Sequence, residues 1–374
     1  MTHLTDIEQL GYLGMRLAMR RRATPPELRT LARQCAERRN RNLRHWIDHE
    51  ELPGVTLEGI EKVRRAHELH RGVVLTSFQI GPYNWIPLIL NSRASMPVTL
   101  LMDDANFQEE QRRWLSRESH YRLGLAEPVR YINSEEPTAV WKMACALRER
   151  RTLIGWFDGH TGVTDTQSAK SSLAVKFCDT SMRVRMGLAY LSARTGAPLI
   201  LAIAHNQGDD GIALRIEDPL SRDSGETIDE FCQRASQHLV SILEREVHAD
   251  PACWEEWCHL HSWSVFEGAP TTAETGDQSA LLDEVFCLDL ENVDVLKMSS
   301  GDALVSLHTG DALAMTPLVA AIHDRLSTER SGRDVVAGLE GQFPPEEVSG
   351  ALEALLEAGM IVTVARAAGS MAAH

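Results

Sequence analysis

Hydrophobic and polar residues alternate with a helical period at the start of the chain. Leu10, Leu13 and Leu17 recur at intervals of three or four residues among charged side chains, and Leu28 belongs to a second stretch of the same kind. Such spacing places the apolar side chains on one face of a helix. We therefore expect the first 70 residues to form amphipathic helices at the entry to a folded domain.

From residue 72 the pattern changes to short apolar runs separated by longer amphipathic segments. Short runs that end at glycine or aspartate indicate strands, and the longer segments between them indicate helices. The predicted strands are 73–76, 98–102, 152–157 and 198–204, and the predicted helices are 109–122, 137–150 and 183–195. Strands that alternate with helices are typical of an α/β fold with a largely parallel sheet.

A change in composition predicts a domain boundary. Residues 266–283 are rich in Gly, Ala, Pro, Thr, Glu and Asp and contain no long apolar run, as in a linker. The segments that follow are three short strands at 286–290, 293–298 and 303–308, then three helices at 316–326, 333–341 and 345–359. The expected organisation is a first domain at 1–265, a linker at 266–283, a small α+β domain at 284–364 and a tail at 365–374.

Charge and hydropathy exclude some classes of partner. The 374 residues include 38 Lys+Arg and 53 Asp+Glu, a formal net charge of −15, which repels phosphate backbones and disfavours nucleic acid as a partner. The longest apolar runs are far shorter than the roughly 18 residues of a spanning helix, and the start of the chain lacks the order of a signal peptide. We expect no membrane span and a cytoplasmic location. The seven scattered cysteines favour free thiols over a disulfide framework.

Five short segments between residues 35 and 263 are distinctive. They are NRNLRH (40–45), GVVLTSFQIGPYNW (72–85), LIGWFD (153–158), RTGAP (194–198) and PACWEEWCHLHSW (251–263). In this order and spacing they resemble the lipid A biosynthesis branch of the lysophospholipid acyltransferase-like superfamily. The resemblance implies an acyltransferase-like fold, with a mostly parallel sheet flanked by helices.

The chain departs from that family at the residues that carry its chemistry. Family members have a histidine that deprotonates the acyl acceptor and a carboxylate that orients the histidine. Here the histidine position is Gln79, and the turn at 81–86 lacks the carboxylate. A carboxamide has no group that titrates near neutral pH. We therefore expect that the chain is not a conventional acyltransferase.

The order of strands and helices in 284–364, with the closing run EAGMI at 357–361, resembles a PqqD-like domain. Such domains recognise peptides in enzymes that mature ribosomally made peptides. The resemblance implies that a leader peptide adds a strand to a sheet edge beside the last helix. The predicted peptide-binding residues are Val305, Leu307, Val348, Leu352 and Leu355. The alternative is a generic winged-helix accessory module.

Polar residues follow the predicted strands 73–76 and 152–157. Because the carboxyl ends of parallel strands open into one crevice, we expect these residues to line a common cavity. His160 is the predicted proton acceptor, since an imidazole titrates near neutral pH, with Asp158 orienting it and Gln79 positioning a peptide amide. Tyr83 and Asn84 are predicted to bind substrate by hydrogen bonds. The alternative is a solvated turn beside a decayed site.

Two further groups of side chains offer binding chemistry. Arg183 and Arg185, at the start of the predicted helix 183–195, are candidates for binding a carboxylate or a phosphate. Four zinc-type donors occur near the end of the first domain, at Cys253, Cys258, His259 and His261. On a continuous helix these side chains point in several directions, so we expect no metal. No dinucleotide, phosphate-loop or nucleophile-elbow motif occurs in the sequence, and we expect no cofactor.

Three functions fit these observations. In the first, which we favour, the protein binds a ribosomal precursor peptide, alone or with other maturation enzymes, and cyclises or rearranges the core peptide in a repurposed acyltransferase-like cleft. In the second, it transfers an acyl group from a coenzyme A or carrier-protein thioester, with His160 as a relocated base. In the third, it is a non-catalytic partner that presents the precursor to another enzyme.

Overall fold

The structure, a computed structural model, describes residues 5–48, 51–69, 72–104, 106–108, 124–125, 127–159, 172–208, 211–266 and 282–364. The chain divides into two compact units. The large unit is Ala18–Ser264, and the small unit is Met1–Leu17 together with Val265–His374. The first 17 residues thus group with the C-terminal region, although the sequence analysis placed them in the first domain. Most of the predicted linker and the whole predicted tail lie outside the described residues.

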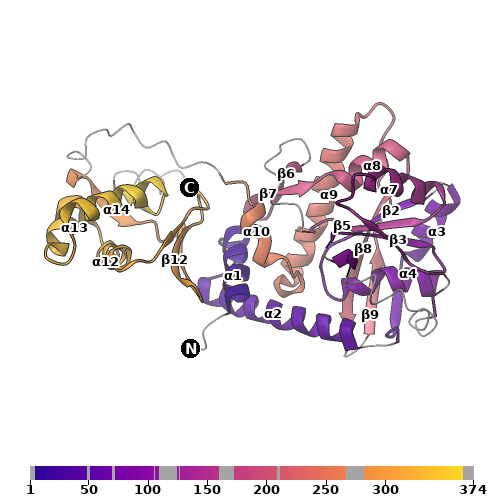
Figure 1. Cartoon of the computed structure of the whole chain (residues 1–374), viewed down its shortest axis with the longest axis horizontal. Coiled ribbons are helices and arrows are strands. Elements are labelled where there is room, and N and C mark those ends of the chain that lie inside the picture. Colours follow the sequence, from indigo (N-terminus) through magenta and orange to yellow (C-terminus); the bar gives the residue numbers. More distant parts are fainter. Residues whose placement is uncertain are drawn as a thin grey trace. The chain divides into compact units, whose positions relative to one another are not determined.

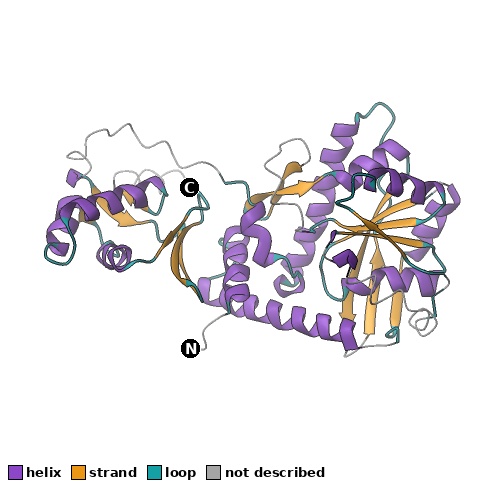
Figure 2. Cartoon of the chain, in the orientation of Figure 1, coloured by secondary structure: helices purple, strands orange, loops and turns teal. Residues whose placement is uncertain are grey.

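Seven strands form the central sheet of the large unit within the described residues (Figure 2). Their bounds are β1 (Val55–Glu58), β2 (Val73–Ser77), β3 (Val98–Met102), β4 (Arg130–Asn133), β5 (Thr152–Trp156), β8 (Leu199–Gln207) and β9 (Gly211–Ile216). The order is β1-β9-β8-β2-β5-β3-β4. The five strands from β8 to β4 run parallel, whereas β9 is antiparallel to β8 and β1 runs parallel to β9. The prediction of an α/β fold with a mostly parallel sheet is confirmed.

Burial explains which strands were predicted. All five residues of β2 are buried, because helices cover both faces of the sheet there, and such strands are continuous apolar runs in the sequence. Three strands of this sheet were not predicted. Of these, β1 and β9 alternate between more and less buried positions at one end of the sheet, and β4 at the other end has only two buried residues. Such short or alternating patterns give a weaker signal than an unbroken apolar run.

Helices cover both faces of this sheet (Figure 1). Their bounds are α2 (Pro25–Asp48), α3 (Ile60–Leu69), η1 (Tyr83–Trp85), α4 (Ile86–Ala94), α7 (Ala139–Arg148), α8 (Gly187–Thr195), α9 (Ile228–Ala249), η2 (Pro251–Cys253) and α10 (Trp257–Trp263). The core on one face joins α2, α3 and α4 to the sheet through buried residues such as Trp46, Val63, Leu75 and Trp85. On the other face α7 and α8 pack on the sheet, and α9 packs on α8. The predicted helix 137–150 is confirmed as α7, and the predicted helix 109–122 lies outside the described residues.

A hairpin corrects the interpretation of two arginines. Strands β6 (Ser172–Phe177) and β7 (Thr180–Arg185) pair antiparallel, so Arg183 and Arg185 lie on a strand and not at the start of a helix. Their side chains are exposed, while Met182 and Val184 between them are buried. This alternation has a period of two, which the prediction of a single helix over 183–195 overlooked. Only α8 is helical there.

The small unit contains two three-stranded sheets and three helices among its described C-terminal residues. The sheets have the orders β14-β10-β15 and β11-β12-β13. The strands are β10 (Val285–Leu288), β11 (Val293–Met298), β12 (Gly301–Ser306), β13 (Ala312–Ala314), β14 (Arg330–Ser331) and β15 (Ile361–Thr363), and the helices are α12 (Pro317–Arg325), α13 (Gly332–Leu339) and α14 (Pro345–Glu357). The three predicted helices are confirmed. The three predicted strands also form, but they belong to two sheets.

The face of α14 predicted to contact peptide belongs instead to the core of the small unit. Val348 and Leu352 are 0% exposed and Leu355 is 1% exposed, and they pack with Phe286 and Leu304. Val305 and Leu307 are also buried, at 5% exposure each. These five side chains are therefore not the walls of an open groove. The three on α14 form the apolar stripe with which the helix closes the core of the small unit.

Helix α1 (Asp6–Met19) contributes its first residues to the small unit and is held there by polar contacts. The Tyr12 hydroxyl donates to Asp294 on β11, and Arg16 forms an ion pair with the same carboxylate at 3.1 Å. Asp6 accepts hydrogen bonds from Ser299, just after β11. Along the described chain, no helix combines the length and the apolar character needed to cross a membrane.

Candidate functional site

The turn after β2 brings several predicted site residues together. The backbone amide of Gln79 donates to both carboxylate oxygens of Asp158, at 2.9 and 3.2 Å. The Tyr83 hydroxyl donates to the side-chain carbonyl of Gln79 at 2.8 Å. Asn84 follows Tyr83 in η1 and is partly buried. His160, the predicted base, lies outside the described residues.

Asp158 is a buried acid that fastens this turn. It is 3% exposed, and the indole nitrogen of Trp254 donates to it at 2.7 Å. Burial raises the pKa of Asp158 to about 7, and the nearby Glu256 carboxylate adds to this effect, although the donors from Trp254 and Gln79 oppose it. Since the surrounding donors already occupy its oxygens, Asp158 holds the turn in place.

The segment after α9 crosses the same turn. The amide of Glu255 donates to the carbonyl of Gln79 at 3.0 Å, and the amide of Gly81 donates to that of Cys253 at 3.2 Å. Gly81 has φ +56°, and a Cβ atom there would lie 2.6 Å from the carbonyl oxygen of Ala204 on β8. Only glycine allows the turn to approach β8 so closely. Residues 251–256 and the turn after β2 therefore form one packed layer above the ends of β2 and β8.

A second buried acid lies in this layer. Glu255 is 7% exposed and accepts a hydrogen bond from the Asn42 side chain at 3.0 Å. Burial raises the pKa of Glu255 to about 7, although Asn42 and the Arg39 guanidinium oppose the shift. Burial and the carboxylates of this layer also raise the pKa of Tyr83 well above its ordinary value. Tyr83 is therefore a hydrogen-bond donor at physiological pH and not a phenolate.

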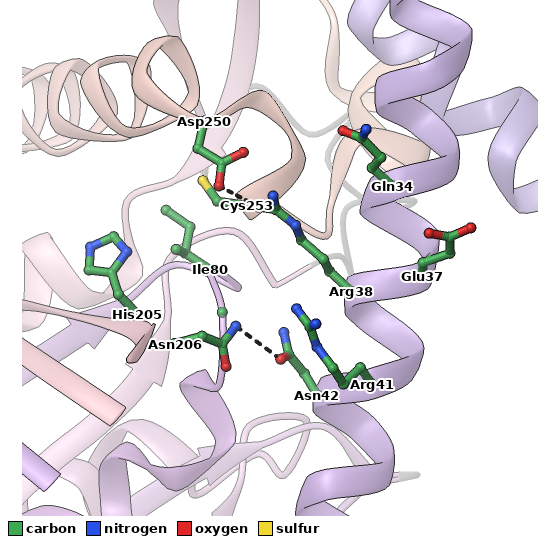
Figure 3. Close-up of a pocket in the computed structure, with 11 residues that line it drawn as sticks. Gln34, Glu37, Arg38, Arg41, Asn42, Ile80, His205, Asn206, Asp250 and Cys253 are labelled. Carbon is green, nitrogen blue, oxygen red and sulfur yellow. Dashed lines mark hydrogen bonds and ion pairs between the residues drawn. The ribbon is translucent and has the colours of Figure 1, made fainter. Parts of the chain in front are cut away.

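A cavity of about 470 Å³ lies between this layer and α2 (Figure 3). It is bounded by α2, the turn after β2, the end of β8 and the segment after α9. Its lining residues are Gln34, Glu37, Arg38, Arg41, Asn42, Ile80, Gly81, His205, Asn206, Asp250 and Cys253. The cavity thus lies at the carboxyl ends of β2 and β8, whereas the sequence analysis placed the cleft at β2 and β5. Of the described candidates, Gln79, Tyr83, Asn84 and Asp158 are not among its lining residues.

A histidine and a carboxylate form a pair at the wall of this cavity. Nε2 of His205 lies 3.3 Å from Oε2 of Glu246 on α9, and Arg215 on β9 donates to the other carboxylate oxygen at 2.6 Å. Burial raises the pKa of Glu246, but the contacts with His205 and Arg215 outweigh burial and bring it down to about 2. Glu246 is therefore ionised at neutral pH. The contact with Nε2 of His205 does not have hydrogen-bond geometry, so the two side chains form an electrostatic pair.

The sequence contained one signal for this pair. His205 directly follows the predicted strand 198–204, at the carboxyl end where parallel sheets carry their functional residues. The same rule applied to β8 would have selected it. Nothing in the sequence linked it to Glu246, because that residue is 41 positions away (246 − 205) on a helix whose docking only the fold defines.

The remaining lining of the cavity is polar. Asn206 donates to Asn42 at 3.3 Å, and Asn42 in turn donates to Glu255, so a chain of hydrogen bonds leads from the cavity to the buried acid. Arg38 pairs with Asp250, as the dashed line in Figure 3 shows. Burial and nearby carboxylates raise the pKa of Cys253 to about 12, so its thiol stays protonated and is a poor nucleophile. The arrangement suits a polar ligand and proton transfer by His205.

No protein-family model and no curated protein matches this chain. The resemblances to the acyltransferase superfamily and to PqqD-like domains therefore stay predictions from short sequence segments.

Proposed function

We propose that the protein binds a ribosomally made precursor peptide and modifies the core peptide by non-oxidative acid–base chemistry. The observation that carries this proposal is the His205–Glu246 pair at the wall of a polar cavity. Histidine is the commonest general acid–base residue in enzymes, and a nearby carboxylate favours its protonated form. The volume of the cavity, about 470 Å³, falls in the usual range of small-ligand sites. The resemblance of residues 284–364 to PqqD-like domains supplies the substrate class.

His205 takes the role of proton acceptor in this proposal. Its Nε2 faces Glu246, which leaves Nδ1 to accept a proton from a ligand. Gln79 does not titrate, and Asp158 is engaged by the Gln79 amide and Trp254. His160, the proton acceptor predicted from the sequence, stays a second candidate, since the described residues do not include it.

The cavity lining has groups that match a peptide. The carboxamides of Gln34, Asn42 and Asn206 can donate to and accept from backbone amides. Arg41 is exposed on the same helix as Asn42, where its guanidinium can pair with a peptide carboxylate. Such polar contacts hold one segment of a peptide in place beside the base.

Strand β13 is the edge that we assign to the leader peptide. In the described part of the small unit, it pairs with β12 alone. Ser306 of β12 donates to Asp311, and Met315 donates to Asp302. Because hydrogen-bonded pairs alternate along an antiparallel ladder, the amides of Ala312 and Ala314 face away from β12. An added strand would find these amides unused by the sheet.

The same cavity supports a second candidate function, acyl transfer from a thioester of coenzyme A or of a carrier protein. The His205–Glu246 pair has the histidine and carboxylate that this chemistry needs. Arg38 and Arg41 line the cavity and would meet the phosphates of such a donor.

One experiment separates these functions. Synthetic peptides encoded by short reading frames beside the gene are incubated with the full chain, with and without acyl-coenzyme A, and the peptide masses are measured. A change of mass or of fragmentation without the donor supports peptide modification, and a gain that requires the donor supports acyl transfer. Binding without either change contradicts both and supports a non-catalytic partner. His238→Gln, on an exposed face of α9, is the matched control for His205→Gln.

A further inference from the structure

Three metal-binding side chains converge in the large unit, away from the cavity. They are Cys178, in the turn between β6 and β7, and Glu244 and His248, one helical turn apart on α9. Sγ of Cys178 lies 3.5 Å from Nε2 of His248, and Oε1 of Glu244 lies 3.8 Å from the same nitrogen. We propose that Cys178, Glu244 and His248 form a zinc site that joins the β6–β7 turn to α9.

The geometry distinguishes a metal site from a catalytic triad. In a cysteine–histidine–carboxylate triad, the thiol and the carboxylate contact different ring nitrogens, because the histidine relays a proton between them. Here both Cys178 and Glu244 face Nε2 of His248. All three donor atoms lie within 4.8 Å of one another, so small side-chain movements would bring them around one ion. Convergence on a point is the arrangement of ligands around an ion.

The distance between the sulfur and the nitrogen also fits the bond lengths of zinc, whereas the 3.8 Å between Glu244 and His248 would shorten to roughly 3.4 Å on binding. Bonds of roughly 2.3 Å to sulfur and 2.05 Å to nitrogen, at a tetrahedral angle, place the two donor atoms roughly 3.5 Å apart. The Cys178–His248 separation is 3.5 Å. One thiolate, one imidazole and one carboxylate form a mixed donor set that suits zinc better than calcium or magnesium, which prefer oxygen alone. Three protein ligands leave a fourth position for water.

The backbone holds Cys178 in an unfavourable conformation. Phe177 pairs with Thr180, so Cys178 and Asp179 form a two-residue hairpin turn, and Cys178 has φ +51°. Such turn positions normally hold Gly, Asn or Asp, since a side chain is strained there. The turn is fixed by its surroundings, because Asp179 donates its amide to Ala18 and accepts that of Arg21. A cysteine at a strained and anchored position is consistent with a ligand role.

The charges around the site permit metal binding. Burial and the Arg22 guanidinium lower the pKa of His248, so its imidazole is neutral and able to bind a metal. Burial and Glu244 raise the pKa of the Cys178 thiol to about 12, so zinc must displace the thiol proton. Binding therefore releases one proton as the S–H bond is exchanged for an S–Zn bond. Two further charges change the pKa of the thiol in opposite directions, since Arg22 lowers it and Asp179 raises it.

The test uses the full chain, stripped of metal with a chelator and titrated with Co²⁺ as a spectroscopic substitute for Zn²⁺. We expect one Co²⁺ per chain, with a thiolate-to-cobalt charge-transfer band that Zn²⁺ abolishes. Cys178→Gly should lose the band, and it should fold because glycine is favoured at φ +51°. His248→Gln and Glu244→Gln should weaken binding. Cys145→Ser, at a partly buried free cysteine on α7, is the matched control and should keep the band.

Zinc should also raise the melting temperature of the wild type and of Cys145→Ser, but not that of Cys178→Gly. The proposal is overturned if the wild type shows no charge-transfer band. It is equally overturned if the band survives in Cys178→Gly, or if zinc stabilises that variant as much as the wild type.

Discussion

Asp158 accepts the backbone amide of Gln79 with both carboxylate oxygens, at 2.9 and 3.2 Å. This contact lies where the acyltransferase superfamily, on the predicted resemblance, has its catalytic histidine. Gln79 has no titratable group, and Asp158 is held by hydrogen bonds from the Gln79 amide and Trp254. Neither side chain is therefore assigned as the proton acceptor. We therefore propose that proton transfer occurs in the neighbouring cavity, where His205 lies 3.3 Å from Glu246.

The buried acid Glu255 predicts how stability depends on pH. Its pKa is about 7 in the folded chain and near 4.5 ordinarily. Between these values the unfolded chain releases a proton that the folded chain keeps, so the free energy of unfolding falls as pH rises. Glu255→Gln, which retains an acceptor for Asn42, removes this contribution. We expect the variant to gain stability relative to the wild type as pH rises from about 5 to about 8.

Chemical denaturation at several pH values measures this difference. The variant must be compared with the wild type, because other groups also make the stability depend on pH. The pKa values of His67, His248 and His261 are lowered by folding, so these residues make the free energy of unfolding rise with pH up to their ordinary pKa. Glu58→Gln, at an exposed position on β1, is the control for replacing a glutamate by glutamine. A constant offset between Glu255→Gln and the wild type across this range would contradict the prediction.

The contacts of α1 predict that two ion pairs of the small unit contribute very different amounts to the free energy of unfolding. The side chains of Arg16 and Asp294 are only 7% and 12% exposed. Asp294→Ala would leave Arg16 buried without its counter-charge and remove the acceptor of Tyr12, at a cost of about 3 kcal/mol or more in unfolding free energy. Adding Arg16→Met should recover part of the loss.

The matched control is Asp283→Ala in the exposed pair with Arg333, where no measurable change is expected. Urea unfolding of the variants measures both effects. Equal losses for Asp294→Ala and Asp283→Ala would show that α1 is not held by this buried pair.

The assignment of the leader peptide to β13 predicts the effect of proline. Ala312→Pro removes an amide that faces away from β12, so it should spare the ladder and weaken peptide binding roughly two- to tenfold, the value of one hydrogen bond. Lys297→Pro makes the same change on β11, the opposite edge of this sheet, and should leave affinity unchanged. Calorimetry with the synthetic precursor peptide measures both. The reverse result would move the peptide to β11.

Much of the fold was predictable from the sequence, because the central strands are continuous apolar runs and the helices of the small unit carry clear amphipathic patterns. The missed elements have physical reasons. The strands β1, β4, β6, β7 and β9 are short and only partly buried, so none of them is an unbroken apolar run in the sequence. The helix α1 contains ordinary helical spacing, which does not show which part of the chain it packs against.

The candidate site was only partly predictable. The polar turns after β2 and β5 do meet, as the sequence indicated, but their side chains bond to one another and to Trp254. A sequence shows which polar residues follow strands, but it does not show which are used up by hydrogen bonds within the fold. A sequence also does not show which apolar residues are buried inside the fold. Leu352 was therefore predicted to line a peptide groove, whereas its burial shows that it closes a core.

The most direct test of the central claim is the rate at which His205→Gln modifies the precursor peptide, measured by mass spectrometry beside the wild type and His238→Gln. We expect the rate to fall about 10²- to 10⁴-fold in His205→Gln, as for the loss of a general base, with peptide affinity unchanged. His238→Gln should match the wild type. Full product formation by His205→Gln would contradict the assignment of proton transfer to this cavity.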